Sequence, residues 1–121
     1  MILLVGGEKG GSGKSCLAQN IAVYLQRKKQ DVLLLDADPQ GTTTDWAKER
    51  EMNDELINLS CVQASGNIRQ TLKDIAKRYQ IVVVDVGGQD SEALRSAMTV
   101  ATHMLLPFRP KRRDLKTLVN V

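Results

Sequence analysis

The sequence predicts an α/β fold in which a mostly parallel sheet is flanked by helices on both faces. Short apolar runs alternate along the chain with stretches of helical period, which is the order expected of strands joined by crossover helices. Two of the runs, residues 32–35 and 81–84, are apolar throughout, as strands covered on both faces should be. Residues 1–121, of which 42% are hydrophobic, are expected to form a single domain.

The first half of the chain is expected to hold three strands and two helices. The strands are Ile2–Gly6, Asp31–Asp36 and Leu56–Val62. Helical spacing gives the first helix, which starts near residue 15, an inner face formed by Leu17, Ala18, Ile21, Ala22 and Leu25. A short second helix carries Trp46 and is expected to be capped by Thr42 or Thr43, because a threonine hydroxyl can accept a hydrogen bond from a free N–H group of the first turn.

The second half is expected to add two strands and three helices. The strands are Ile81–Asp85 and Thr102–Pro107. The helix between residues 68 and 79 has an inner face formed by Ile68, Leu72, Ile75, Ala76 and Tyr79. The next helix is capped by Asp90 or Ser91, and its expected inner residues are Ala93, Leu94, Ala97 and Met98. Asp114 is expected to cap a last helix, which is cut short at Val121.

Residues 9–15 carry the clearest indication of a ligand. They read Lys9-Gly10-Gly11-Ser12-Gly13-Lys14-Ser15. A glycine-rich turn between a strand and a helix is typical of a phosphate-binding loop, where backbone N–H groups and the helix N-terminus contact phosphate oxygens. Lys14 is expected to reach the β- and γ-phosphates, Ser15 to bind Mg²⁺, and Cys16 to adjoin the nucleotide. The alternative is a flexible loop with two solvated lysines.

This loop departs from the common phosphate-loop pattern at Glu8, where that pattern has glycine. Its sequence instead resembles that of the deviant Walker A ATPases, the class of P-loop NTPases that includes the ParA partition proteins, the MinD cell-division regulators and nitrogenase iron protein. The resemblance implies that Lys9 contacts the phosphates of the partner in a nucleotide-sandwich dimer. The family fold continues beyond this length, so we expect a partial domain in which the C-terminal strands of the family are missing.

Acidic residues follow two of the predicted central strands. Asp36 and Asp38 belong to the sequence Asp-Ala-Asp-Pro-Gln-Gly, and Asp85 ends the apolar run of residues 81–84. Ligands of open α/β sheets bind beyond the carboxyl ends of the strands, and carboxylates there can order Mg²⁺ and water. The alternative is that these aspartates only form strand-end turns.

The resemblance assigns a role to each of these residues. In partition ATPases the residue matching Asp38 orients the attacking water, and the residue matching Asp36 supports the metal shell. Asp85 matches the Walker B aspartate, which holds Mg²⁺ through water. Gly88 is expected to contact the γ-phosphate in a switch loop that moves when this phosphate arrives or leaves.

The predicted function is that of a small ParA-type ATPase of plasmid or chromosome partition. The resemblance implies that ATP and Mg²⁺ stabilise a homodimer that binds DNA non-specifically, and that a centromere-binding adaptor stimulates slow hydrolysis. The alternatives are a MinD-like membrane-associated regulator and a nucleotide-binding fragment without activity of its own. An iron-protein reductase and a metabolic ligase of the same fold are disfavoured by the cysteine positions and by Lys9, respectively.

Charge, hydropathy and cysteine positions bear on the partner, the location and the state of the thiols. The net charge of +3 arises mainly from a cluster containing Arg109, Lys111, Arg112 and Arg113, which suits either DNA or a solvated loop. The sequence shows no membrane-spanning run, so a cytoplasmic, nucleoid-associated location is expected. Cys16 and Cys61 have no metal or redox spacing and are expected to be reduced and buried.

Overall fold

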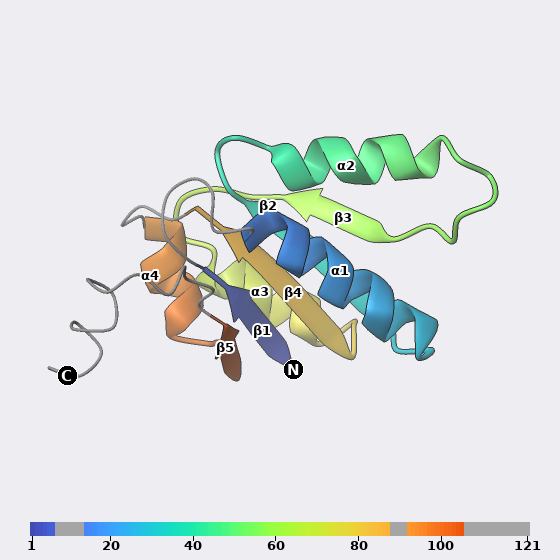
Figure 1. Cartoon of the computed structure of the whole chain (residues 1–121). Helices are drawn as coiled ribbons and strands as arrows, with labels where there is room; N and C mark the ends of the chain where they lie inside the picture. Colours follow the sequence, from blue (N-terminus) through green and yellow to red (C-terminus); the bar gives the residue numbers. More distant parts are fainter. Residues whose placement is uncertain (7–13, 88–91, 106–121) are drawn as a thin grey trace, which may run out of the picture.

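The computed structural model describes residues 1–6, 14–87 and 92–105, which form a five-stranded parallel sheet with helices on both faces (Figure 1). The elements, in chain order, are β1 Ile2–Val5, α1 Lys14–Arg27, β2 Val32–Ala37, α2 Thr42–Glu51, β3 Ser60–Gln63, α3 Arg69–Ala76, β4 Ile81–Val86, α4 Glu92–Met98 and β5 His103–Leu105. The predicted fold class is therefore confirmed. Within the described residues, no helix is both long and apolar enough to span a bilayer.

The strands lie in the order β3-β2-β4-β1-β5, and every neighbouring pair is parallel. β2 and β4 are central, and all of their residues are buried, which agrees with their continuously apolar sequences. Their register pairs Asp36 with Asp85. Two carboxylates from distant parts of the chain are thus neighbours at the carboxyl edge of the sheet.

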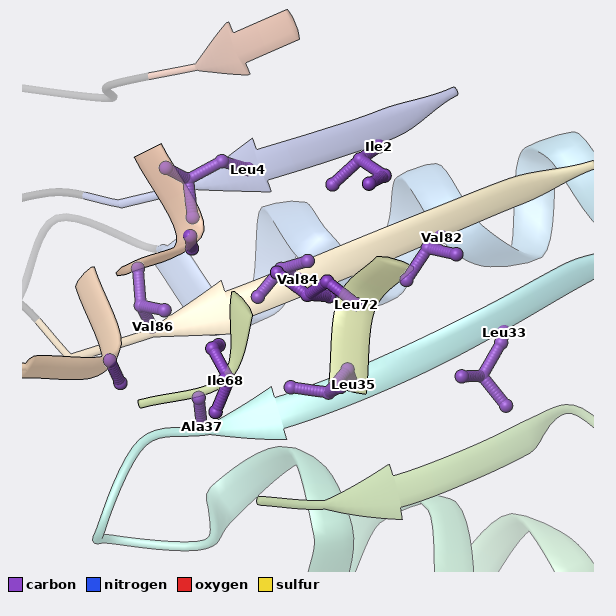
Figure 2. Close-up of a cluster of buried hydrophobic side chains, with 12 residues drawn as sticks. Ile2, Leu4, Leu33, Leu35, Ala37, Ile68, Leu72, Val82, Val84 and Val86 are labelled. Carbon is purple, nitrogen blue, oxygen red and sulfur yellow. The ribbon is translucent and has the colours of Figure 1, made fainter. Parts of the chain in front are cut away.

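Each face of the sheet has its own hydrophobic core, because alternate side chains of a strand point to opposite faces. Figure 2 shows the face covered by α3, where Leu35 and Val84 from the central strands pack with Ile68 and Leu72. The opposite face packs Leu34 and Val83 against α1, whose buried small residues are Ala18 and Ala22. By the same alternation, Asp36 and Asp85 lie on the α1 face.

The predicted third strand, Leu56–Val62, begins too early. β3 starts at Ser60, which pairs with Leu33 of β2. The β2 strand itself begins at Val32, so residues before position 59 have no β2 residue beside them. Leu56 and Ile57 are exposed for this reason, and β3 is an edge strand of four residues.

The predicted inner position of Met98 is also wrong, since half of this residue is exposed. α4 ends at Met98, and its buried residues are Ala93, Ser96 and Ala97. Ser96 and Ala97 occupy the core side of the last turn, and Met98, the final residue of the helix, lies outside it. The predicted caps Asp90, Ser91 and Asp114 lie outside the described residues.

Candidate functional site

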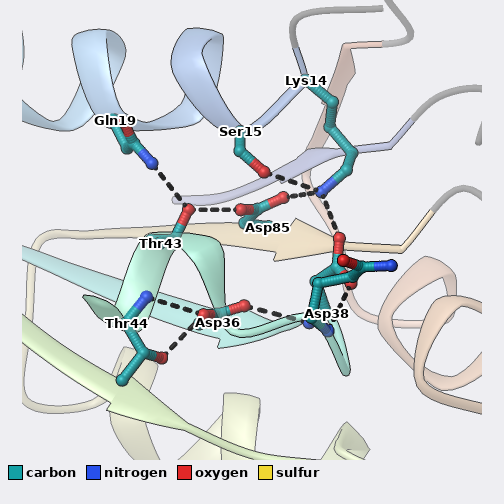
Figure 3. A network of polar contacts seen from close by, with 9 residues as sticks. Lys14, Ser15, Gln19, Asp36, Asp38, Thr43, Thr44 and Asp85 are labelled. Atoms are coloured by element: carbon teal, nitrogen blue, oxygen red, sulfur yellow. Dashed lines mark hydrogen bonds and ion pairs between the residues drawn. The ribbon is translucent and has the colours of Figure 1, made fainter. Parts of the chain in front are cut away.

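A polar network lies where the carboxyl ends of β2 and β4 meet the first turns of α1 and α2 (Figure 3). Lys14 begins α1, Asp36 and Asp85 lie near the ends of their strands, and Thr43 belongs to the first turn of α2. The parallel strands bring their carboxyl ends to one edge, and the two crossover helices start at that edge. Residues that are far apart in the sequence are therefore in contact here.

The Lys14 side chain is the centre of this network. Its ammonium Nζ lies 3.0 Å from Asp38 Oδ2 and 3.3 Å from Ser15 Oγ, and it forms an ion pair with Asp85 Oδ1. Only 8% of Lys14 is exposed, and a buried ammonium is costly unless it is paired and hydrogen-bonded. Three oxygens from α1 and from the ends of β2 and β4 thus converge on one cationic position.

The Asp85 carboxylate is fully buried, and each of its oxygens has a different donor. Lys14 pairs with Oδ1, while the Thr43 hydroxyl donates to Oδ2 at 2.5 Å. Gln19 Nε2 in turn donates to Thr43 Oγ1 at 3.1 Å. Helices α1 and α2 together therefore determine the direction of this carboxylate.

The neighbouring Asp36 carboxylate is also fully buried and is bound by α2 and the loop before it. Its Oδ2 accepts hydrogen bonds from the Thr44 N–H at 2.8 Å and from the Thr44 hydroxyl at 2.6 Å. The Asp38 N–H donates to Oδ1 at 3.0 Å. A free N–H group and the partial positive charge of a helix N-terminus favour an anion at this position.

The predicted threonine cap of α2 is wrong. The N-cap is Gly41, whose φ of 69° is left-handed, and no side chain caps the helix. Thr43 points into the site, and its hydroxyl bonds to Asp85 rather than to the backbone of its own helix. The first turn of α2 therefore uses its hydroxyl groups to hold carboxylates.

Asp38 is partly exposed beside Lys14 and has a shifted pKa. Partial burial raises the pKa, but the hydrogen bond from the Gln40 N–H and the hydrogen bond and charge of Lys14 outweigh it and lower the pKa below 3.8. Asp38 is consequently ionised at neutral pH and is a weak base.

The two cysteines differ from each other. Cys16 is exposed, so its predicted burial is wrong, whereas Cys61 on β3 is half-buried. Cys16 lies on the outer side of α1, between the inward-facing residues Lys14 and Ala18. Burial, together with the negative charges of Asp36 and Asp85, raises the pKa of Cys61 to about 11 despite a hydrogen bond with Thr44. The Cys61 thiol is therefore protonated at neutral pH and a poor nucleophile.

The donor set around Lys14 suits a hard cation. Mg²⁺ prefers carboxylate and other oxygen ligands, and Ser15 Oγ and Asp85 Oδ1 both face the position of a positive charge. Asp36, the third predicted metal residue, accepts hydrogen bonds from backbone N–H groups and the Thr44 hydroxyl, whereas Asp85 Oδ1 is paired with a cation. Among the described residues, no group of three acidic, histidine or cysteine side chains is arranged to hold a metal by itself. Ser15 and Asp85 therefore fit Mg²⁺ best.

Several predicted site residues lie outside the part of the chain that the structure describes. They are Lys9, Gly10, Gly11, Ser12, Gly13 and Gly88. The basic residues Arg109, Lys111, Arg112 and Arg113 lie outside it as well. Of the predicted residues that are described, Lys14, Ser15, Asp38 and Asp85 meet at one position, Asp36 lies beside them, and Cys16 is exposed nearby in sequence on α1.

The sequence profile of the CobQ/CobB/MinD/ParA nucleotide binding domain matches residues 3–118. The chain belongs to this family. Protein ParA of Rhizobium radiobacter is 34% identical over 113 residues, which cover 93% of this chain and 50% of that protein. Maintenance of carboxysome distribution protein A of Gloeobacter kilaueensis is 35% identical over 114 residues, again 93% of this chain and 50% of that protein. The chain thus spans half the length of these curated relatives.

Solved structures share the fold of this ParA/MinD-family chain. A plasmid partition protein from Borrelia burgdorferi superposes with a TM-score of 0.77 at 20% identity, over 99% of this chain and 70% of that chain. FlhF in complex with GMPPNP and Mg²⁺ superposes with a TM-score of 0.64 at 18% identity, over 98% of this chain and 49% of that chain. The predicted P-loop NTPase fold is therefore confirmed.

Sequence reasoning missed three site residues of this family member: Gln19, Thr43 and Thr44. Both threonines were available as a signal, because three consecutive threonines directly follow the Asp-Pro-Gln-Gly segment. Thr42 or Thr43 was instead assigned to capping, which is the commoner role of threonine at a helix start, and Thr44 was given no role. Gln19 could have been noticed one helical turn after Ser15, since residues four apart share a helix face.

Proposed function

We propose that this chain is the nucleotide-binding part of a ParA-like partition ATPase that binds and slowly hydrolyses Mg-ATP. The observation that supports the proposal best is the meeting of Lys14, Ser15, Asp38 and Asp85 at one edge of the sheet in a member of this family. These residues supply one cation and several oxygen ligands, which are the groups that phosphoryl transfer requires.

In this proposal, Lys14 exchanges its carboxylate contacts for phosphate oxygens when ATP binds. The Lys14 ammonium then neutralises charge that develops on the transferred phosphoryl group. Ser15 and Asp85 hold Mg²⁺, which supplies further charge neutralisation when bound. Lys9 contributes a second cation from the partner in a nucleotide-sandwich homodimer.

Asp38 orients the attacking water by accepting a hydrogen bond from it. Because its pKa is lowered by the Gln40 and Lys14 contacts despite partial burial, Asp38 takes up a proton poorly. Slow intrinsic turnover follows, because the described site residues include no strong general base, and stimulation by an adaptor protein would accelerate it. Binding of non-specific DNA by the ATP form completes the proposed cycle.

Nucleotide binding tests the first part of this proposal. A fluorescent N-methylanthraniloyl ATP titration should show binding to the wild-type chain, and Lys14→Ala should weaken it by about tenfold or more, since a charge-assisted contact is worth about 1.5–3 kcal/mol. Lys48→Ala, which removes an exposed lysine from α2, is the matched control. Equal affinities of the wild-type chain and the Lys14→Ala variant would contradict a phosphate-binding role.

Assembly and DNA binding are tested separately by sedimentation. The chain should be monomeric with ADP and dimeric with a non-hydrolysable ATP analogue, and DNA should sediment with the dimer only. Equal DNA binding with ATP, with ADP and without nucleotide would contradict the ATP-dependent switch.

Positioning of a protein body in the cell is a second candidate function for the same ATPase cycle. It rests on the carboxysome distribution protein, which is 35% identical to this chain, whereas the ParA relative is 34% identical. In this candidate the ATP dimer still binds DNA, but the adaptor is attached to a protein cargo. Identification of the adaptor by affinity purification with the ATP analogue, followed by localisation of its cargo, separates the two functions.

A further inference from the structure

We propose that Thr43 is a positioning residue that aims the Asp85 carboxylate, so that Oδ1 faces the cation position while Oδ2 is held. The inference rests on the proposed Mg-ATP site and assigns Thr43 a role that acts through Asp85. It starts from a buried hydrogen bond of 2.5 Å between the Thr43 hydroxyl and Asp85 Oδ2.

The two oxygens of Asp85 have separate tasks in this geometry. Oδ1 faces the Lys14 ammonium, next to Ser15 Oγ, and Oδ2 faces α2 (Figure 3). A carboxylate at a strand end can rotate about its side-chain bonds, and a donor on one oxygen restricts that rotation. Both Thr43 and Asp85 are 0% exposed, so water does not replace this donor readily.

Gln19 determines the direction in which the Thr43 hydroxyl donates. Gln19 Nε2 donates to Thr43 Oγ1 at 3.1 Å, which uses a lone pair of the hydroxyl oxygen. The hydroxyl hydrogen is then directed to Asp85. The chain of hydrogen bonds from Gln19 through Thr43 to Asp85 links α1, α2 and β4, and each bond polarises the next.

The neighbouring threonines show that this role is specific to position 43. Thr44 uses both its N–H and its hydroxyl for Asp36, and Thr42 is exposed on the outer side of the same turn. Thr43 alone of the three is fully buried and reaches Asp85. Thr42 therefore provides a matched control in which the same hydroxyl group is lost one residue away.

The test measures how much Mg²⁺ strengthens binding of N-methylanthraniloyl ATP, by titration in Mg²⁺ and in EDTA. Thr43→Val keeps the shape of the side chain but removes the hydroxyl, and we expect it to reduce the Mg²⁺-dependent gain in affinity by about tenfold, as for other residues that orient metal ligands. Thr43→Ser should restore most of the gain, and Gln19→Leu should reduce it less than Thr43→Val does. Thr42→Val should leave it unchanged.

Two outcomes would overturn the inference. One is an unchanged Mg²⁺-dependent gain in Thr43→Val. The other is an equal loss of affinity in Mg²⁺ and in EDTA, which would indicate a purely structural role of Thr43.

A second measurement needs no nucleotide and keeps the inference separable from the proposed function. Failure of the wild-type chain to bind the fluorescent ATP would contradict the proposed function. The Thr43–Asp85 contact would then be tested by the free energies of urea unfolding of Thr43→Val, Asp85→Asn and the double variant. Such a double-mutant cycle isolates the coupling energy between the two residues. A clear coupling supports the contact, and additive effects overturn it.

Discussion

At the scale of single residues, the site is a balance of buried charges. Asp36 and Asp85 are fully buried next to each other, and the Lys14 ammonium forms an ion pair with Asp85. A buried carboxylate that loses its partner is strongly destabilising, while the intact pair adds little to stability. Lys14 therefore has a structural task in the nucleotide-free chain in addition to its proposed contact with phosphate.

This balance predicts an effect of Lys14→Met on stability. The free energy of unfolding should fall by about 3 kcal/mol in urea denaturation without nucleotide, because the buried Asp85 carboxylate loses its ammonium partner. Adding Asp85→Asn to Lys14→Met should recover part of this loss. Lys48→Met, at an exposed position of α2, is the control, and equal stability of the two lysine variants would contradict the prediction.

The cysteines give a second prediction at this scale. Iodoacetamide at pH 8 should modify exposed Cys16 quickly and Cys61 slowly. Because the pKa of Cys61 is raised from 9.0 to about 11, its thiolate fraction there is about a hundredfold below that of an unshifted thiol. Its rate should keep rising as the pH approaches 11 in folded protein.

Single-cysteine variants Cys16→Ser and Cys61→Ser assign the two rates by mass spectrometry. Urea should remove the difference between the thiols, because unfolding exposes Cys61 and separates it from the carboxylates. A folded Cys61 that reacts as fast as Cys16 at pH 8 would contradict the raised pKa.

At the scale of elements, the start of α2 places Thr43 and Thr44 over the ends of β4 and β2. The turn that allows this contains Gly41, which has a φ of 69° and donates its N–H to the Asp38 carbonyl. A side chain at a left-handed φ is strained. Gly66, in the loop before α3, has nearly the same φ of 72° and takes part in none of the site hydrogen bonds described above.

Substitution of the two glycines should separate an effect on the free energy of unfolding from an effect on nucleotide affinity. Gly41→Ala and Gly66→Ala should each lower the free energy of unfolding by about 1 kcal/mol, because the added Cβ strains the left-handed backbone and meets only ordinary contacts. Gly41→Ala alone should also weaken binding of the fluorescent ATP in Mg²⁺. Equal nucleotide affinities of the two variants would show that the turn does not position α2 for the site.

At the scale of the whole molecule, the described residues form a five-stranded parallel sheet, and the chain spans half the length of its curated relatives. β3 and β5 are the edge strands of the described sheet, and Met104 and Leu105 of β5 are partly exposed. The proposed dimerisation and DNA binding belong to this scale, because both would require surfaces beyond the nucleotide site. We propose that the basic residues between 109 and 113 are the part of the sequence that contacts DNA.

This basic cluster predicts a DNA-specific defect. Arg112→Ala with Arg113→Ala should reduce sedimentation with DNA in the ATP-analogue state and make binding less sensitive to salt, since fewer counterions are released. Affinity for the fluorescent ATP should not change. Arg27→Ala with Lys28→Ala, which removes two exposed charges at the end of α1, is the control, and an equal loss of DNA binding in both pairs would contradict a specific role of the cluster.

Much of the fold could be predicted because its signals are local. The apolar runs that became β2 and β4 and the helical period of α1 and α3 need only neighbouring residues to be recognised. The start of β3 could not be predicted in the same way, because it depends on where β2 begins. The inward face of α4 was misjudged at Met98, since the helix end and the packing of Ala97 decide which residues reach the core.

The sequence by itself determined the parallel α/β class, the phosphate-loop pattern and the position of acidic residues at strand ends, because each follows from local order and spacing. Only the tertiary structure decided which atoms meet. Lys14 reaches Asp85 across 71 positions, and Thr43 reaches it across 42. Such contacts depend on the strand order and on the placement of α2, which are long-range properties that residue spacing does not encode. The roles of Thr43, Thr44 and Gln19 therefore emerged with the fold.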